Sequence, residues 1–161
     1  MKSHKVIIGI DPGITGAIAI LENDETTIYD VPTIKTYRGT KKVNDYDILS
    51  MSVRLGAYRR HYDVAVCIEQ VGAMPGNGSV SMFNFGRGLG IWEGICGAYG
   101  WTPVFVRPQT WKKAYGLIGL DKDASRQYAL AHHSFLANYF SRKKDHGRAD
   151  ALLIAQWLRD R

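Results

Sequence analysis

Short apolar runs separated by polar turns dominate the first part of the chain, and such runs predict β-strands. Three of them follow one another closely, which favours an antiparallel meander. Farther along, a run rich in Val and Ile ends at Glu69, and a last short run begins at Pro103. The five predicted strands cover residues 6–11, 17–21, 26–31, 63–69 and 103–106.

Helical spacing of apolar residues marks several of the segments between and after these strands. After a loop rich in Gly, Thr and Lys at residues 36–42, Asn44 or Asp45 is expected to cap a helix that runs to about residue 62. Ser79 is expected to cap a long helix, and Pro108 suits the first turn of another. The later helices are expected at residues 79–100, 109–115, from Asp121 or Asp123 to about 137, and from about 147 to the end.

The resulting order of elements is β-β-β-α-β-α-β-α-α-α. A meander followed by strands that are linked through helices predicts an α/β fold with a mixed five-stranded sheet and helices on both faces. This order resembles that of the RNase H-like fold. A length of 161 residues suits one core, so residues 1–161 are expected to form a single domain.

Two carboxylates end strands that this order makes parallel neighbours. Asp11 ends the first strand and Glu69 ends the fourth. Neighbouring strands lie about 4.8 Å apart, and sites in open α/β sheets form outside the carboxyl ends of the strands. Two acids at this spacing disfavour each other's ionised form unless a cation intervenes. Oxygen ligands of this kind favour Mg²⁺ or Mn²⁺.

A His/Asp pair near the C-terminus completes the candidate site. Asp150 begins an apolar helix, and His146 lies four residues earlier, on the same helical face if the helix starts that early. If the helix starts only at Arg148, Asp145 is free to turn inward as a fourth acid. The predicted catalytic and metal-binding residues are Asp11, Glu69, His146 and Asp150. Two ions about 3.5–4 Å apart would serve phosphodiester hydrolysis.

Each of these residues also has a purely structural interpretation. Asp11 precedes Pro12 and Gly13, and Asp often begins such a turn. Asp150 is favoured at a helix start by the helix dipole, and a histidine such as His146 is commonly a surface or capping residue. Glu69 is more informative because glutamate is depleted in strands. The joint occurrence of the four residues in this element order favours the functional interpretation.

Composition and charge indicate the kind of partner and the cellular location to expect. The formal net charge is +6 and the pI is near 9.4, which favours binding to polyanions. Cys67 and Cys96 have no partner at zinc-finger spacing and are expected to be reduced packing residues. No stretch approaches the ~18 apolar residues of a membrane helix. The first apolar run is too short for an export signal, so we expect no membrane association and a location in the cytoplasm of a bacterial or phage-infected cell.

The sequence resembles the RuvC family of Holliday junction resolvases. The matching pieces are Ile8-Gly9-Ile10-Asp11-Pro12-Gly13, Ile68-Glu69-Gln70-Val71, Pro108 with Lys112, Lys122, and Ala149-Asp150-Ala151-Leu152-Leu153-Ile154-Ala155. The resemblance implies an RNase H-like fold, a homodimer, Mg²⁺ dependence and symmetric nicking of four-way junctions and related branched DNA. It also implies that Asp11, Glu69 and Asp150 are metal ligands.

Two positions depart from the cellular members of that family. Cellular enzymes carry an acid or histidine three residues before the last Asp, where this chain has Gly147. The pattern is more similar to the bacteriophage branch, in which Asp or His followed by Gly precedes the last acid by four residues, and this favours His146. Cellular members also have an aromatic residue where this chain has Gly72. Phe83 or Phe85 is a candidate substitute that helps to open the junction.

Basic residues near the predicted helix starts are candidates for DNA binding. The resemblance supports Lys112 and Lys122 as phosphate contacts; the alternative is a solvated helix face. The predicted DNA-binding residues are Arg87, Lys112, Lys113, Lys122, Arg126 and Arg148. On the long helix, four apolar residues fit either a dimer face or core packing, namely Leu89, Ile91, Trp92 and Ile95.

Two other functions are compatible with parts of the sequence. Residues 9–16 resemble the first phosphate loop of actin-like and sugar-kinase ATPases, but those proteins clamp the nucleotide between two such domains. A branched-DNA-binding module that does not cut is the second alternative. The acidic set argues against it, because carboxylates oppose DNA binding unless a metal neutralises them.

Overall fold

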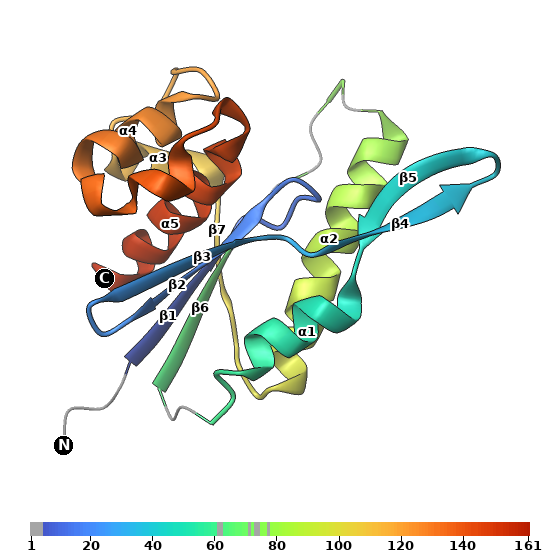
Figure 1. Ribbon diagram of the computed structural model, residues 1–161, viewed down its shortest axis with the longest axis horizontal. Helices are drawn as coiled ribbons and strands as arrows, with labels where there is room; N and C mark the ends of the chain where they lie inside the picture. The colour runs from blue at the N-terminus through green and yellow to red at the C-terminus, as the bar shows by residue number, and fades with distance from the viewer. Residues whose placement is uncertain (1–4, 61–62, 71, 73–74, 77) are drawn as a thin grey trace.

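A five-stranded sheet forms the centre of the protein, as a computed structural model shows for residues 5–60, 63–70, 72, 75–76 and 78–161 (Figure 1). The strand order is β3-β2-β1-β6-β7. The strands are β1 (Lys5–Ile10), β2 (Ala17–Glu22), β3 (Glu25–Asp30), β6 (Asp63–Glu69) and β7 (Val104–Val106). The mixed five-stranded sheet predicted from the sequence is therefore confirmed.

The register of the sheet decides where the acidic residues lie. Strands β1, β2 and β3 form the antiparallel meander, whereas β6 runs parallel to β1 with Ile68 opposite Ile10. Strand β7 is parallel to β6, with Val106 opposite Glu69. Because β1 and β6 end at the same level, Asp11 and Glu69 come to the same edge of the sheet.

Helices cover both faces of this sheet, as predicted (Figure 1). Helices α1 (Ile48–Gly56) and α2 (Ser79–Ala98) pack on one face, where Ile8 and Ile10 meet Trp92. Ile7 points to the other face, which holds α3 (Pro108–Ala114), α4 (Ala124–His132) and α5 (His146–Arg159). A strand covered on both sides is apolar at every position, which explains the continuous apolar run of β1.

Helix α5 packs directly on the backbone of β1. A Cβ atom added at Gly9 would lie 2.3 Å from the Ala151 carbonyl oxygen and 2.4 Å from the Ala155 nitrogen. Only glycine at this position allows such a close approach. The contact fixes the start of α5, and with it His146 and Asp150, over the end of β1.

Gly9→Ala is expected to lower the free energy of unfolding by about 3 kcal/mol, the upper part of the range for overpacking, because the clash is with helix backbone. Gly94→Ala is the matched control: Gly94 is an exposed glycine of α2 with no atom within 4 Å of an added Cβ. That change should stabilise the protein by about 0.5–1 kcal/mol. Urea unfolding measures both, and parental stability of Gly9→Ala would contradict the close packing.

The loop predicted at residues 36–42 is wrong. Strands β4 (Thr33–Arg38) and β5 (Lys41–Tyr46) form a separate two-stranded sheet, with a turn at Gly39, whose φ is 61°. Most of its residues are exposed on both faces, so it lacks the apolar alternation that identifies a half-buried strand. The polar sequence of these two strands therefore gave no pattern from which the hairpin could be predicted.

Several helix boundaries also differ from the prediction. Asp47 caps α1 by accepting a hydrogen bond from the Ser50 amide at 3.0 Å, whereas Asn44 and Asp45 belong to β5. The helix ends at Gly56, and residue 62 lies outside the described residues, as does Val71 of the Glu69 motif. The helix that starts after Asp123 ends at His132, followed by 3₁₀ segments at Ser134–Phe140 and Lys143–Asp145.

The apolar residues of α2 belong to the core. Trp92 and Ile95 are buried against the sheet, and Leu89 and Ile91 pack partly against the same cluster. Core packing thus accounts for Trp92 and Ile95 and for part of the Leu89 and Ile91 surfaces, and a dimer face on this helix stays a prediction. Cys67 and Cys96 are buried free thiols, as expected. Across the described ranges, no helix has the length and apolarity needed to cross a bilayer.

Candidate active site

One cavity of about 610 Å³ collects the predicted catalytic residues. Asp11 follows β1, Glu69 ends β6, and His146 and Asp150 lie in the first turns of α5. The cavity also holds two lysines and several neutral side chains. Its lining includes Asp11, Tyr46, Glu69, Phe85, Lys112, Lys122, Ser125, His146 and Asp150. The structure therefore brings together four acidic or imidazole groups that are far apart in the sequence.

Glycines allow the backbone to close around Asp11. The Gly13 amide donates a hydrogen bond to Asp11 Oδ1 at 3.4 Å. A Cβ atom at Gly147 would lie 2.8 Å from the Thr15 carbonyl oxygen and 3.4 Å from Asp11 Oδ2. Gly147 thus lets the start of α5 approach the Asp11 carboxylate, which a larger residue would prevent.

Two neutral side chains orient the other carboxylates. The Trp111 indole Nε1 donates a hydrogen bond to Glu69 Oε2 at 2.8 Å, and Ser125 hydrogen-bonds Asp150. Sequence reasoning missed both residues. The only available signal for Trp111 was its place beside Lys112, since a buried tryptophan usually needs a partner for its N–H. No signal identified Ser125, because its contact with Asp150 depends on how α4 packs against α5.

Burial and mutual repulsion disfavour the ionised forms of the three carboxyl groups. Burial raises the pKa of Asp11 well above its usual value, and the charges of Glu69 and Asp150 raise it further. Burial likewise raises the pKa of Glu69 to about 7, although the Trp111 hydrogen bond opposes the change. The pKa of Asp150 is raised by burial despite Ser125 and Lys112.

The donor set fits a divalent cation. Carboxylate oxygens are the ligands that Mg²⁺ and Mn²⁺ prefer, and a cation would offset the repulsion that raises these pKa values. Within the described part of the chain, no three His, Cys, Asp or Glu side chains form a finished ligand cluster.

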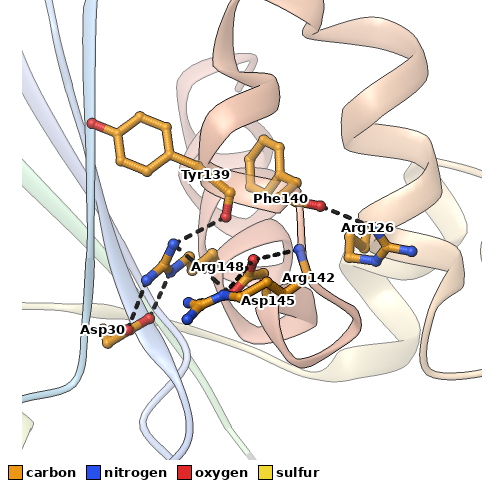
Figure 2. A network of polar contacts seen from close by, with 7 residues as sticks. All are labelled: Asp30, Arg126, Tyr139, Phe140, Arg142, Asp145 and Arg148. Carbon is orange, nitrogen blue, oxygen red and sulfur yellow. Dashed lines mark hydrogen bonds and ion pairs between the residues drawn. The ribbon is translucent and has the colours of Figure 1, made fainter.

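Asp145 belongs to a different network, shown in Figure 2. Its carboxylate is 2% exposed and accepts hydrogen bonds from the Arg142 amide at 2.8 Å and the Arg142 guanidinium at 2.7 Å. Arg148 lies 3.8 Å away. Burial tends to raise the pKa of Asp145, but the Arg142 hydrogen bonds and the two arginine charges hold it below its usual value. Asp145 is absent from the cavity lining and His146 is part of it, which favours His146 as the fourth site residue.

The predicted DNA-binding residues divide into two groups. Lys112 and Lys122 line the cavity, and Lys113 is exposed on α3. The other three are engaged within the protein. Arg87 pairs with Asp45, Arg126 binds Asp123 and the Phe140 carbonyl, and Arg148 binds Asp30 and the Tyr139 carbonyl. Figure 2 shows the Arg126 contact with Phe140 and the Arg148 contacts.

Arg126 and Arg148 have partners within the protein, so their predicted contacts with DNA stay predictions. Arg126 is 7% exposed, and each of its three guanidinium nitrogens donates to an oxygen of the protein. Arg148 donates twice to Asp30, at 2.7 and 2.8 Å. Both arginines hold the segment around α5 in place. The sequence offered no sign of this for Arg148, whose partner Asp30 lies 118 residues away, whereas Asp123 stands only three residues before Arg126.

Phe83 and Phe85, the two aromatic residues predicted to help open the junction, differ in their position relative to the cavity. Gly72 is exposed and carries no ring. Phe85 lines the cavity and is 42% exposed, while Phe83 is 70% exposed and is not among the lining residues. Phe85 is therefore the better placed of the two predicted substitutes, and its action on a junction stays a prediction.

Trp111→Phe is expected to slow phosphodiester cleavage by about 10- to 100-fold and to raise the Mg²⁺ concentration needed for half-maximal rate, because Glu69 loses the donor that orients it. Trp157→Phe is the matched control. Trp157 belongs to the same apolar cluster, and its Nε1 has no hydrogen-bond partner among the described residues. Equal Mg²⁺ dependence in both variants would show that the Trp111 contact only fills space.

The sheet order, the two helical layers and the acidic cavity at the strand ends define an RNase H-like fold of the RuvC type. The chain is similar to RuvC of Thermus thermophilus in complex with a Holliday junction substrate, with a TM-score of 0.53, 18% identity and coverage of 94% of this chain and 90% of that one. A second Thermus thermophilus RuvC structure gives a TM-score of 0.52 at 19% identity, with 93% and 90% covered. The fold predicted from the family resemblance is confirmed.

A sequence relative points in the same direction. The chain is 36% identical over 91 residues to "Holliday junction resolvase MOC1, chloroplastic" of Chlamydomonas reinhardtii. The match covers 56% of this chain and 10% of the length of that relative. No family model matches the chain. The similarity to the bacteriophage branch stays a prediction.

Proposed function

We propose that the protein is a metal-dependent endonuclease that cleaves four-way DNA junctions and related branched DNA. The observation that carries this proposal is the meeting of three half-buried carboxylates, Asp11, Glu69 and Asp150, in one cavity beside Lys112. Such a cluster is chemically suited to phosphodiester hydrolysis. The names of the similar proteins support the substrate, since they include a Holliday junction resolvase and a RuvC complex with a Holliday junction substrate.

The residues divide the chemical work among them. Asp11, Glu69 and Asp150 would hold two Mg²⁺ ions, with Mn²⁺ as a substitute, and His146 would serve as a further ligand or as a proton carrier. The bound cations would supply positive charge against the oxygens of the scissile phosphate. Lys112 and Lys122 lie at the same cavity and would hold the phosphate. The Trp111 N–H and the Ser125 hydroxyl keep Glu69 and Asp150 in position.

The symmetry of the substrate supports a homodimer. Resolution of a four-way junction requires cuts in two strands, and a twofold-symmetric dimer presents two equivalent sites to the two strands. The net charge of +6 per chain favours binding to DNA. We therefore include a homodimer that nicks at symmetric positions in the proposal.

The test compares a synthetic four-way junction with linear duplexes of the same arm sequences, in Mg²⁺ and under single-turnover conditions. We expect two nicks at symmetric positions in the junction and intact linear duplexes, with a dimer in analytical ultracentrifugation. Equal cutting of the linear duplexes would contradict the substrate assignment. Paired symmetric nicks by a strictly monomeric protein would contradict the dimer.

A further inference from the structure

The β4–β5 hairpin extends away from the body of the protein, beyond α2 (Figure 1). It pairs with no strand of the central sheet, and an isolated two-stranded hairpin is only marginally stable in water. Its base is anchored at the candidate active site. The Tyr46 hydroxyl at the end of β5 donates a hydrogen bond to the Pro12 carbonyl at 3.1 Å, next to Asp11, and Tyr46 lines the cavity. The hairpin therefore projects from the edge of that site.

The pairing register assigns the hairpin residues to two faces. Side chains directly opposite each other in an antiparallel pair share a face. Arg38, opposite Lys41, belongs to a face that turns toward α2, because Arg38 Nη2 donates to Asn84 Oδ1 at 3.3 Å. Asp45 lies on the same face and pairs with Arg87 of α2. The other face carries the pair Thr33 and Tyr46 at its base, where Tyr46 is buried, and farther out the four residues called the outer face below, Lys35, Tyr37, Lys42 and Asn44.

The outer face is exposed and basic. All four of its side chains are exposed, and Tyr37 is 66% exposed. In the described part of the chain, neither Lys35 nor Lys42 takes part in an ion pair. The one carboxylate of the hairpin, Asp45, is already paired with Arg87. Two unpaired ammonium groups around a tyrosine and an amide suit a sugar-phosphate backbone, where lysine, tyrosine and asparagine are common contacts.

We propose that the outer face binds the backbone of a duplex arm of the branched DNA, outside the cleavage site. Six residues of strand at about 3.3 Å each place the hairpin tip roughly 20 Å from its base. Successive phosphates of one strand advance by about 3.4 Å along the duplex axis, so the contacts fall within roughly six base pairs of the cut. This inference rests on the proposed function for the identity of the DNA. The positive charge of the hairpin favours a polyanion whether or not the proposed function is correct.

The test uses a Lys35→Gln/Lys42→Gln variant and a four-way junction with long arms of about 15 base pairs, which extend past the hairpin tip. Affinity is measured in EDTA by fluorescence anisotropy over a series of salt concentrations. We expect the affinity of the variant to fall on the order of tenfold at 0.1 M salt, and the slope of log K against log salt to become less negative by about 1.8.

Arg59→Gln/Arg60→Gln is the matched control. Both arginines are exposed after the C-terminal end of α1, whereas the hairpin leads into its N-terminal end, and the change likewise removes two positive charges. The control should bind long-armed junctions like the parent. Tyr37→Ala should weaken long-arm binding several-fold and Tyr37→Phe should restore it. Thermal unfolding of every variant checks that the fold is kept.

Two results would overturn the inference: parental affinity and salt slope in the Lys35→Gln/Lys42→Gln variant, or an equal loss in the arginine control. Because affinity is measured without cleavage, the two proposals fail separately. A junction that is bound through the hairpin and never cut contradicts the proposed function alone. A junction that the hairpin variant binds and cuts normally contradicts the hairpin contact alone.

Discussion

Asp11→Asn is expected to abolish junction cleavage while junction affinity stays within a few-fold of the parent. Loss of a residue that merely orients a metal ligand typically costs 10- to 100-fold, so removal of a central carboxylate should cost more than about 100-fold. Affinity depends instead on the basic residues that neutralise phosphates. Single-turnover cleavage in Mg²⁺ and anisotropy in EDTA measure the two quantities on the same DNA.

The same variant should be more stable than the parent in EDTA. Asp11 lies among like charges in the cavity, where desolvation and the charges of Glu69 and Asp150 raise its pKa and disfavour its ionised form, so a neutral amide removes repulsion. Mg²⁺ should raise the Tm of the parent and have little effect on Asp11→Asn, because a ligand stabilises only the fold that binds it. Asp24→Asn, in the exposed β2–β3 turn, is the control. If Asp11→Asn loses binding as fully as cutting, Asp11 is a structural residue.

Asp145→Ala and His146→Ala are expected to fail in different ways. Asp145→Ala should lower the free energy of unfolding by about 3 kcal/mol, since it leaves Arg142 and Arg148 without their buried acceptor. His146→Ala should keep parental stability and cut at least about 100-fold more slowly, as expected for loss of a proton-transfer or ligand group. Urea unfolding and single-turnover cleavage at matched Mg²⁺ and DNA concentrations separate the two effects.

His132→Ala is the control for loss of an imidazole. His132 is exposed on α4, and its ring nitrogen contacts the Tyr128 carbonyl outside the cavity lining. We expect it to cut like the parent. The assignment of His146 would be wrong if Asp145→Ala were stable and inactive while His146→Ala cut normally, because the site would then be a set of four carboxylates.

The central sheet was predictable because its pattern is local. Strand β1 is buried on both faces and reads as one apolar run, and β6 has the bounds expected from its Val and Ile content. The parallel pairing of these strands brings Asp11 and Glu69 to one edge, which the order of elements alone predicts. The β4–β5 hairpin was missed for the opposite reason, since a projecting ribbon buries little and has no apolar pattern.

The partners of charged residues were only partly predictable from spacing. Asp123 pairs with Arg126 and Arg142 pairs with Asp145 at a spacing of three residues, which is the spacing of side-chain pairs in helices. The pairing of Arg148 with Asp30 was not predictable, because it is a tertiary contact between distant segments. The acidic set itself was visible because each member ends a strand or begins a helix.

Nicking of a synthetic four-way junction in Mg²⁺ and in EDTA tests the central claim most directly. The account predicts paired nicks in Mg²⁺ or Mn²⁺ and no product in EDTA, with restoration when excess Mg²⁺ is added back. Equal nicking in EDTA would contradict a metal-dependent site at Asp11, Glu69 and Asp150. Tight binding with no cleavage at any Mg²⁺ or Mn²⁺ concentration would contradict the nuclease and favour a junction-binding module.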